Sequence, residues 1–171
     1  MTDNPMRTIR VEKVVVNCGV GQAGDKLLKA QKVLQMITGQ KAVQTLSRSQ
    51  IRDWGIREKM PIGCRVTLRR ARAEEFLKRA LTVRNRRLPA YSFDLEGNFS
   101  FGIPDYTDFE GMKYDPEIGV YGMDVAVVLE RPGYRVKRRR VHRAVIPGGH
   151  RITRADGIAF ARNQFQVEVV E

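Results

Sequence analysis

The chain has 171 residues, of which 42% are hydrophobic and 29% charged, and its formal net charge is +12. This length suits one domain with a single hydrophobic core, and no apolar run is long enough to span a membrane. The first ten residues, MTDNPMRTIR, lack the apolar core of a secretion signal. We therefore expect a single domain over residues 1–171 of a cytoplasmic protein that has no membrane contact.

The positive charge is concentrated in two blocks of the chain. Residues 41–87 contain 14 basic and 4 acidic residues, and residues 131–154 contain 9 basic residues and no acidic one. Residues 88–130, which lie between these blocks, contain 1 basic and 9 acidic residues. Cations clustered on this scale are typical of proteins that bind nucleic acid or another polyanion. A basic protein that is merely soluble is the alternative interpretation.

The first predicted strand, Arg7–Cys18, becomes continuously β-branched towards its end and is followed by a glycine-rich turn, Gly19–Gly24. A helix with an apolar stripe follows, and Gly39 suits the position just after its last turn. A G-x-G-x-x-G turn between a strand and a helix is also the dinucleotide-binding motif, but the next strand lacks the acidic residue that holds the ribose. A nucleotide-dependent enzyme built on Gly19–Gly24 is therefore an alternative and not the main prediction.

Two further predicted strands, Lys41–Leu46 and Gly63–Arg70, are joined by a long cationic loop. The second of them alternates apolar with basic or polar residues, so one face of the sheet is expected to be basic. The loop, residues 47–62, carries four cations around a single tryptophan. Loops of this length in compact domains are usually functional or disordered. We predict that it is a basic finger ordered by contact with a phosphate-bearing partner.

The remaining elements follow from the same periodicities. A second helix is predicted over Ala71–Arg87, and Thr153 with Asp156 resembles a capping box that begins a short helix. Strands are expected at Asn98–Ile103, Met123–Leu129 and Phe165–Val170. The carboxylates of the acidic block have no histidine or ligand cluster beside them, so we predict no catalytic residue, no metal site and no cofactor.

The two cysteines, Cys18 and Cys64, lie in predicted strands without a CxxC motif, which favours buried free thiols over a disulfide or a zinc site. The second basic block, residues 131–154, contains glycine and proline beside its cations. We predict that this basic arm is extended and lies on phosphates. Its candidate contact residues are Arg135, Lys137, Arg138, Arg139 and Arg140.

Several short motifs, taken in order, resemble those of the family of large-subunit ribosomal protein number five. They are NCGVG (17–21), TGQK (38–41), REKMPIG (57–63), VTLR (66–69), NFSFGI (98–103), PEI (116–118) and GMD (122–124). The likeness covers nearly the whole chain, and the run RPGYRVKRRR (131–140) is similar to the archaeal branch of the family.

The resemblance implies an α+β fold, with a curved, mainly antiparallel sheet, helices packed on one face, and the long basic finger between the second and third strands. It implies a structural constituent of the large ribosomal subunit, in the cytoplasm and in the ribosome, that is not an enzyme. Such a protein binds 5S rRNA and helps to attach it in the central protuberance. The other implied partners are large-subunit rRNA, neighbouring ribosomal proteins and, through the finger, the peptidyl-site tRNA. Outside the ribosome the protein is expected to be a monomer.

Site residues are carried over from the resemblance position by position. The implied rRNA-facing residues are Asn17, Gln40, Lys41, Gln44, Ser47, Arg65, Thr67 and Arg69. The implied tRNA-facing residues, all within the finger, are Ser49, Arg52, Trp54, Arg57 and Lys59. A general nucleic-acid chaperone without a preferred partner is the remaining alternative.

Overall fold

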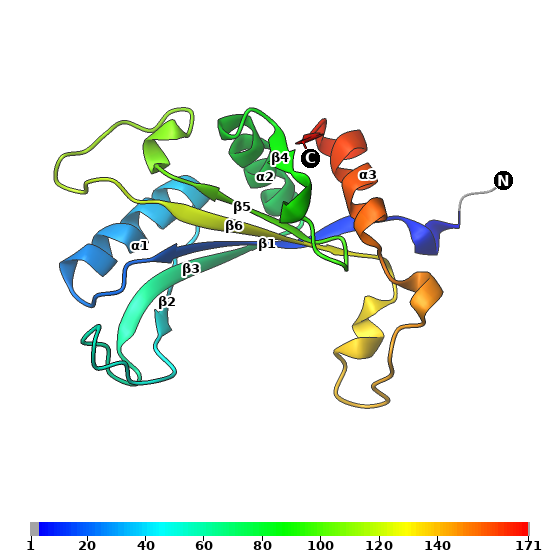
Figure 1. The fold of residues 1–171 in the computed structure, drawn as a ribbon, viewed down its shortest axis with the longest axis horizontal. Helices are drawn as coiled ribbons and strands as arrows, with labels where there is room; N and C mark the ends of the chain where they lie inside the picture. The colour runs from blue at the N-terminus through cyan, green and yellow to red at the C-terminus, as the bar shows by residue number, and fades with distance from the viewer. Residues whose placement is uncertain (1–3, 171) are drawn as a thin grey trace.

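A five-stranded sheet forms the centre of the computed structural model, which describes residues 4–170; residues 1–3 and 171, at the ends of the predicted domain, lie outside the described part (Figure 1). Its strand order is β2-β3-β1-β6-β5, and every neighbouring pair is antiparallel. A separate parallel pair joins β4 to β7. The strands are β1 (Arg10–Gly19), β2 (Val43–Leu46), β3 (Pro61–Arg69), β4 (Arg87–Pro89), β5 (Phe99–Ile103), β6 (Met123–Glu130) and β7 (Glu168–Val170).

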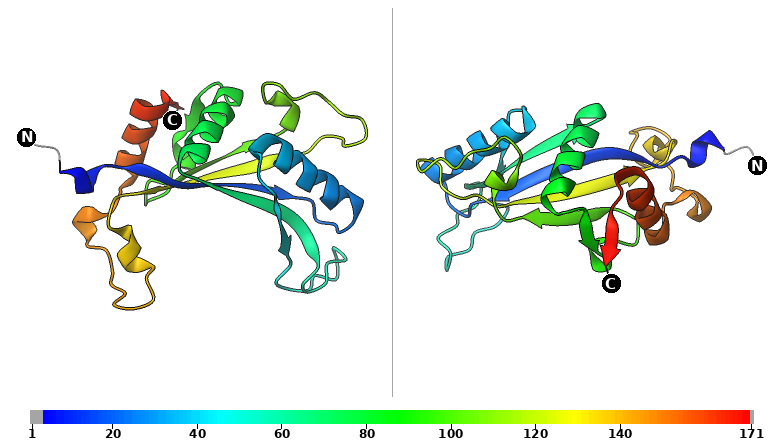
Figure 2. Two further views of the ribbon diagram at one scale, coloured as in Figure 1. Left: turned by 180° about the vertical axis from the view of Figure 1, so that it is seen from behind. Right: turned by 90° about the horizontal axis from the view of Figure 1, so that it is seen from above.

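The three α-helices lie on one side of the curved sheet, as the views from the front, from behind and from above agree (Figures 1 and 2). They are α1 (Asp25–Thr38), α2 (Ala71–Val83) and α3 (Arg154–Phe165). The predicted fold class, α+β with a curved, mainly antiparallel sheet and helices on one face, is therefore confirmed. None of the helices in the described part is long and apolar enough to cross a membrane.

The core lies between the sheet and these helices because the strands alternate. Cys64, Val66 and Leu68 of β3 are buried, as the alternation in the sequence predicts. The apolar residues of β5 and β6 face the same side and are buried with them. Gly39 has a left-handed backbone (φ +66°) and its amide donates to the carbonyl of Gln35, so α1 ends where the sequence predicts.

Several predicted boundaries are wrong. α2 ends at Val83 instead of Arg87, because Asn85 and Arg86 take positive φ angles that no helix accommodates, and the chain then enters β4. The short helix at Thr153 has its predicted capping box but continues to Phe165. The last strand therefore begins at Glu168, three residues later than expected, and pairs in parallel with β4.

The β1-α1-β2 unit is not a dinucleotide-binding unit. β1 and β2 each run antiparallel to β3, which lies between them, so the two strands are not neighbours. A Rossmann fold needs a mostly parallel sheet with the Gly-rich turn at its carboxyl edge. The enzyme alternative built on Gly19–Gly24 thus loses its structural context.

Two segments project on the side of the sheet away from the helices, one near each end (Figure 1). One is the β2–β3 connection, residues 47–60, which occupies the position of the predicted finger but is two residues shorter because β3 begins at Pro61. The other is the basic arm, residues 131–154, which follows β6. Together they flank the sheet face that the helices leave uncovered.

Candidate nucleic-acid interface

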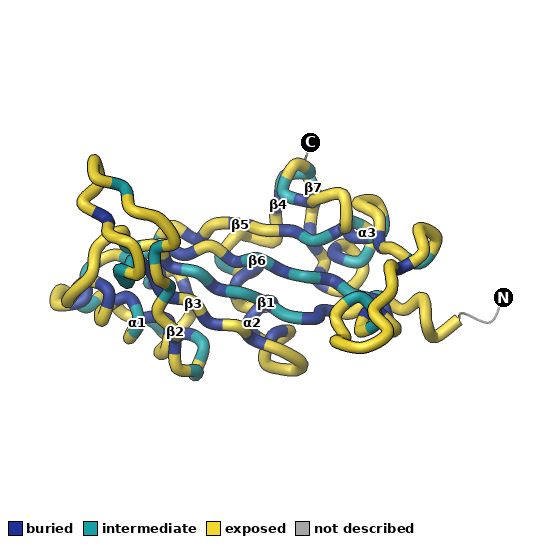
Figure 3. The backbone as a smooth tube through the Cα atoms, turned by 90° about the horizontal axis from the view of Figure 1, so that it is seen from below, coloured by how far each residue is buried: buried dark blue, intermediate teal, exposed yellow. Residues whose placement is uncertain are grey.

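The face of the five-stranded sheet that carries no helix, here called the open face, is seen directly in Figure 3. The antiparallel register of β1 with β3 sets residues opposite each other across this face: Asn17 with Arg65, Val15 with Thr67, and Lys13 with Arg69. The side chains of Arg65, Thr67 and Arg69 are exposed because the alternate residues of β3 fill the core. The structure thus brings together four of the predicted rRNA-facing residues.

Lys13 and Arg69 are like charges placed directly opposite each other on neighbouring strands. Such a pair is destabilising, and here the carboxylate of Glu12, which accepts a hydrogen bond from Arg69, compensates only part of the charge. Arg65 has no carboxylate within 4.0 Å among residues 4–170, so its charge is also available to a partner. The basic part of the open face therefore has the electrostatics of a phosphate-binding surface.

Glu12 is a nearly buried carboxylate at the edge of this surface, with 8% of its area exposed. The β1–β6 register shifts between Val11 and Lys13, so Glu12 is the extra residue of a bulge. Its carboxylate accepts hydrogen bonds from Arg69 (Nη1–Oε1, 3.2 Å) and from both terminal nitrogens of Arg138 (Nη2–Oε2, 2.7 Å). Burial raises the pKa of Glu12, but the bonds from Arg138 and Arg69 outweigh it and hold the pKa below its usual value.

The basic arm is folded, which contradicts the predicted extended conformation. It contains two short 3₁₀ helices, Tyr134–Lys137 and Gly148–His150, and buries Tyr134 together with Ile146. The hydroxyl of Tyr134 donates to the carbonyl of His150 (3.3 Å) and accepts from the amide of Ile152 (3.0 Å). The arm therefore owes its shape to an apolar interior and not to contact with phosphates. The sequence pattern does not reveal this interior.

The five predicted arm residues therefore have different environments. Arg138 is bound to Glu12 and to Glu130 (Nη2–Oε2, 3.1 Å). The hydrogen bond to Glu12 raises the pKa of the Arg138 guanidinium above its usual value. Lys137 lies 5.5 Å from the centroid of the Tyr134 ring. Arg135, Arg139 and Arg140 are exposed.

The β2–β3 connection displays its predicted residues at a narrow tip. Paired hydrogen bonds join the backbones of Ile51 and Ile56 (2.9 and 3.0 Å), and further bonds join Ser47 to Lys59 and Met60. The chain turns between these pairs, where Gly55 takes φ +65°. Trp54 at the tip is 73% exposed. The predicted tRNA-facing residues Ser49, Arg52, Arg57 and Lys59 are exposed as well.

Gln44 does not join the open face. It lies opposite Cys64 in the β2–β3 register, and its side-chain amide reaches Gln31 of α1 at 3.5 Å, so it belongs to the helix-covered side. The strand around it starts at Val43 and not at Lys41. Gln40 and Lys41 consequently lie in the connection between α1 and β2, and Lys41 is exposed there.

Sequence reasoning missed Lys13, Glu12 and Asp124. Lys13 shares its alternation with Asn17 along β1, which is a signal that could have found it. The bulge at Glu12 has no sequence signature of its own. Asp124 lies opposite Asn17 in the β1–β6 register, so the acidic charge on β6 limits the basic surface to the β1–β3 half of the open face.

Cys18 and Cys64 are opposite each other on β1 and β3, and both are buried free thiols, as predicted. The neighbouring Cys18 thiol and burial together raise the pKa of Cys64. Within residues 4–170 no group of three histidine, cysteine or carboxylate side chains is placed to hold a metal ion.

Two family models match the chain. Ribosomal protein L5 matches residues 4–57, which cover β1, α1, β2 and most of the β2–β3 connection. The ribosomal L5P family C-terminus matches residues 61–160, which begin at β3 and end within α3. The two matches together cover most of the chain and follow each other without overlap.

Curated proteins named large ribosomal subunit protein uL5 are similar over nearly the full length. One from Thermoplasma volcanium is 53% identical over 168 residues, covering 98% of this chain and 99% of the relative. One from Sulfurisphaera tokodaii is 50% identical over 171 residues, with 99% and 97% covered. One from Methanococcus aeolicus is 50% identical over 168 residues, with 96% and 93% covered.

Proposed function

We propose, since the chain belongs to the ribosomal protein L5 family, that the basic part of its open face binds 5S rRNA and helps to attach this RNA to the large ribosomal subunit. Family membership itself makes the protein a structural component of the large subunit, located in the ribosome, and not an enzyme. The identity of the RNA and the residues that contact it are the proposed part.

The observation that supports the proposal most is the Lys13–Arg69 pair in its setting. Two cations lie opposite each other on an uncovered sheet face, where Arg69 is bound to Glu12. Arg65 lies four residues away along β3 and has no carboxylate partner among residues 4–170. Each phosphate that these side chains neutralise releases counterions. Asn17 and Thr67, between or beside the cations, offer hydrogen-bonding groups for sugar or base edges.

The β2–β3 connection is proposed to contact the peptidyl-site tRNA. The connection projects on the same side of the sheet as the open face (Figure 1). Its tip carries the exposed residues Trp54, Arg52 and Arg57. An exposed tryptophan beside arginines suits stacking on a base or sugar together with phosphate contact. The separation of this tip from Arg65 and Arg69 allows two RNAs to be bound at once.

The two matched segments are proposed to form one domain over residues 1–171. The buried core includes residues of both, among them Leu34 of α1 and Phe76 of α2. Large-subunit rRNA and neighbouring ribosomal proteins are proposed as further partners, and the protein outside the ribosome as a monomer. The arm cations Arg135, Arg139 and Arg140 are proposed contacts to rRNA.

Competition binding tests this function against the alternative of a general nucleic-acid chaperone. The purified full chain is bound to labelled 5S rRNA at fixed salt and challenged with unlabelled 5S rRNA, bulk tRNA or duplex DNA. We expect 5S rRNA to compete at least about tenfold better than the other two, since specific RNA binding adds shape recognition to charge. Equal competition by all three would favour the chaperone.

A further inference from the structure

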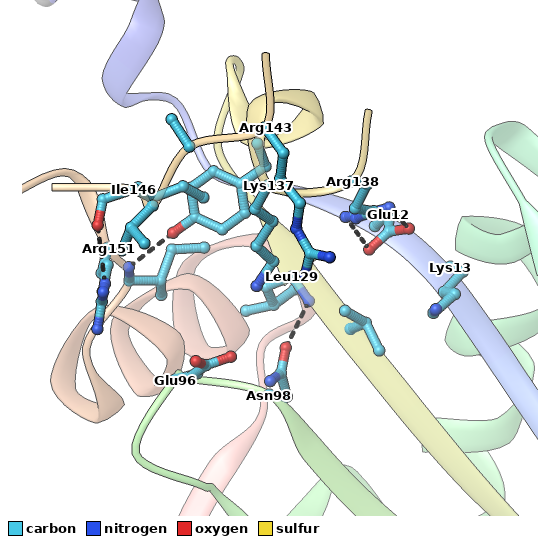
Figure 4. A pocket seen from close by; sticks show the side chains of 15 residues that line it. Glu12, Lys13, Glu96, Asn98, Leu129, Lys137, Arg138, Arg143, Ile146 and Arg151 are labelled. Atoms are coloured by element: carbon cyan, nitrogen blue, oxygen red, sulfur yellow. Dashed lines mark hydrogen bonds and ion pairs between the residues drawn. The ribbon is translucent and has the colours of Figure 1, made fainter. Parts of the chain in front are cut away.

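A cavity of about 630 Å³ lies between the open face and the basic arm (Figure 4). Val128 of β6 forms part of one wall, and Tyr134, Val145, Ile146 and Ile152 of the arm form the apolar part of the other. We propose that this cavity holds one unpaired nucleotide of the bound RNA, with its base among the apolar side chains and its phosphate at the cations. This inference rests on the proposed function and names a subsite within it.

The apolar wall is rigid enough to receive a base. Ile146 and Ile152 are buried, and Tyr134 is held by the two hydrogen bonds of its hydroxyl group. Tyr134 is 8% exposed and has Lys137 over its ring, so the base would contact mainly aliphatic side chains, of which Val145 is 77% exposed. Because these side chains are already in place, they need not be ordered on binding. A volume of about 630 Å³ is in the range of pockets that hold one small molecule, which suits a single unpaired nucleotide.

Cations surround the cavity without matching acids. Those that line it are Lys13, Lys137, Arg138, Arg143 and Arg151. Arg143 and Lys13 have no carboxylate within 4.0 Å in the described part of the chain. Figure 4 shows Arg143 and Lys137 extending from the arm towards β6.

The two lining carboxylates do not balance this charge. Glu12 is already engaged by Arg138 and Arg69, which leaves Glu96 against the other cations. An anion that enters the cavity therefore finds uncompensated positive charge at the position where the apolar wall meets the solvent. A nucleotide, with an apolar base and an anionic phosphate, has this combination of properties, whereas an aliphatic ligand or a bare anion has only one of them.

The polar groups of the cavity are largely occupied, which bears on base selectivity. The side-chain carbonyl of Asn98 accepts from the amide of Leu129 (3.0 Å), and its amide group donates to Asp94 (2.9 Å). The Tyr134 hydroxyl is equally committed. Binding should therefore depend on apolar contact with the base and on phosphate contact more than on base identity.

A titration followed by NMR tests the subsite directly on the full chain. We expect AMP and CMP to cause saturable shifts in the amides of Leu129, Tyr134 and Ile152, with dissociation constants within about threefold of each other because few base-edge groups are free. Inorganic phosphate should bind there at least about tenfold more weakly, since it lacks the base. No saturable shift with either nucleotide, or tighter binding of an oligoglutamate peptide, would overturn the proposal.

Variants connect the subsite to RNA binding. Arg143→Ala removes a cation from the cavity, Val128→Phe fills the cavity without changing charge, and Arg162→Ala on the exposed side of α3 is the control of equal charge loss. We expect the first two to weaken 5S rRNA binding about tenfold and the control to change it less than about threefold. Unchanged melting temperatures would show that the variants remain folded.

The outcomes distinguish a failure of the nucleotide subsite from a failure of the proposed 5S rRNA binding. If the wild type selects 5S rRNA but Arg143→Ala behaves like Arg162→Ala, the nucleotide subsite is wrong and the proposed function stands. If the wild type shows no preference for 5S rRNA, the proposed function fails, and the AMP and CMP titrations still decide whether the cavity binds a nucleotide. Should Val128→Phe fail to fold, Arg143→Ala carries the test alone.

Discussion

Glu12 and Arg138 form a two-pronged ion pair although 126 positions separate them in the chain. Glu12 belongs to the first strand of the sheet and Arg138 to the basic arm, so the pair fastens the arm to the sheet. Glu130 extends the network, since it accepts from Arg138 (3.1 Å) and from Arg10 (2.7 Å). The arm's position beside the open face thus depends on a buried acid in an otherwise cationic region.

Glu12→Gln should loosen the arm. The substitution removes the charge that compensates Arg138 and Arg69, and we expect the free energy of unfolding to fall by about 1–3 kcal/mol. Hydrogen exchange of amides in residues 134–152 should accelerate more than exchange in α1. Glu75→Gln, on the exposed side of α2, is the matched control and should change neither quantity. Unaltered exchange in the arm would show that its apolar interior alone holds it in place.

Stability should decrease in acid through Glu12 and Asp156. The pKa of Asp156 is lowered by hydrogen bonds from Thr153, with burial opposing and the charge of Arg131 assisting. Both folded-state pKa values lie below those of the unfolded chain, so the stabilisation is complete above the unfolded values, near 4, and is lost as the pH falls through the folded ones.

Denaturant titrations between about pH 6 and pH 2.5 measure this dependence. The slope of unfolding free energy against pH should be smaller in Glu12→Gln than in the wild type below about pH 4.5, because that variant has lost one of the two carboxyl groups. The Glu75→Gln control should retain the wild-type slope. Identical slopes in all three proteins would mean that other carboxyl groups dominate the acid response.

Replacing both Arg65 and Arg69 with alanine should weaken 5S rRNA binding and its salt dependence. If about six phosphates are contacted, the logarithm of the wild-type affinity falls with the logarithm of salt concentration with a slope of roughly −4 to −5. The double variant should lose about 1–2 units of this slope. Filter binding at several salt concentrations measures both, with Arg72→Ala/Arg162→Ala as a control of equal charge on the helix side. A wild-type slope near zero would contradict the electrostatic mechanism.

Changes at the tip of the β2–β3 connection should separate the two RNAs. Trp54→Ala, or deletion of residues 49–59, is expected to leave 5S rRNA affinity within about twofold of the wild type, because the tip is distant from Arg65 and Arg69. The same changes should expose the peptidyl-site tRNA to chemical probing in reconstituted subunits. Equal loss of 5S rRNA binding in tip and sheet variants would show that the tip also binds 5S rRNA, contrary to the proposal.

Gly157→Ala should destabilise the fold by about 3 kcal/mol, as overpacking against fixed backbone does. A β-carbon at this position of α3 would overlap the backbone of Gly97, which itself has φ +74°. Gly149→Ala is the matched control, since nothing lies within 4 Å of its would-be β-carbon. Thermal denaturation of the two variants compares them, and equal melting temperatures would indicate that α3 shifts to make room.

The sequence predicts those parts of the fold that follow from local periodicity. The alternation of Cys64, Val66 and Leu68 with Arg65, Thr67 and Arg69 indicates β3 and its basic face, and Gly39 marks the end of α1. The sequence does not predict β4, because a strand of three residues has no measurable period. The predicted last strand begins too early, at Phe165. This residue is in fact the last of α3, which ends because Gln166 takes a left-handed backbone.

Side-chain placements at the candidate interface depend on long-range pairing and were predicted less well. The side of the sheet on which Gln44 lies follows from its register with Cys64, which the sequence leaves undetermined. Arg138 resembles its neighbours in the run of arginines, yet it alone of the five predicted arm residues is engaged by Glu12, which lies far away in the sequence on β1. The folded arm depends on Ile146 and Tyr134 meeting across a segment whose composition alone suggests exposure.

The facing cations Lys13 and Arg69 have one carboxylate close by, Glu12, which Arg138 also engages, so the isolated protein retains electrostatic repulsion among the positive charges there. Dissolved ions screen that repulsion, so moderate salt should raise the melting temperature of the free chain while it weakens the grip on RNA. The phosphates of bound RNA neutralise these cations directly, so the protein should be more stable towards unfolding when it is assembled with RNA than when it is free.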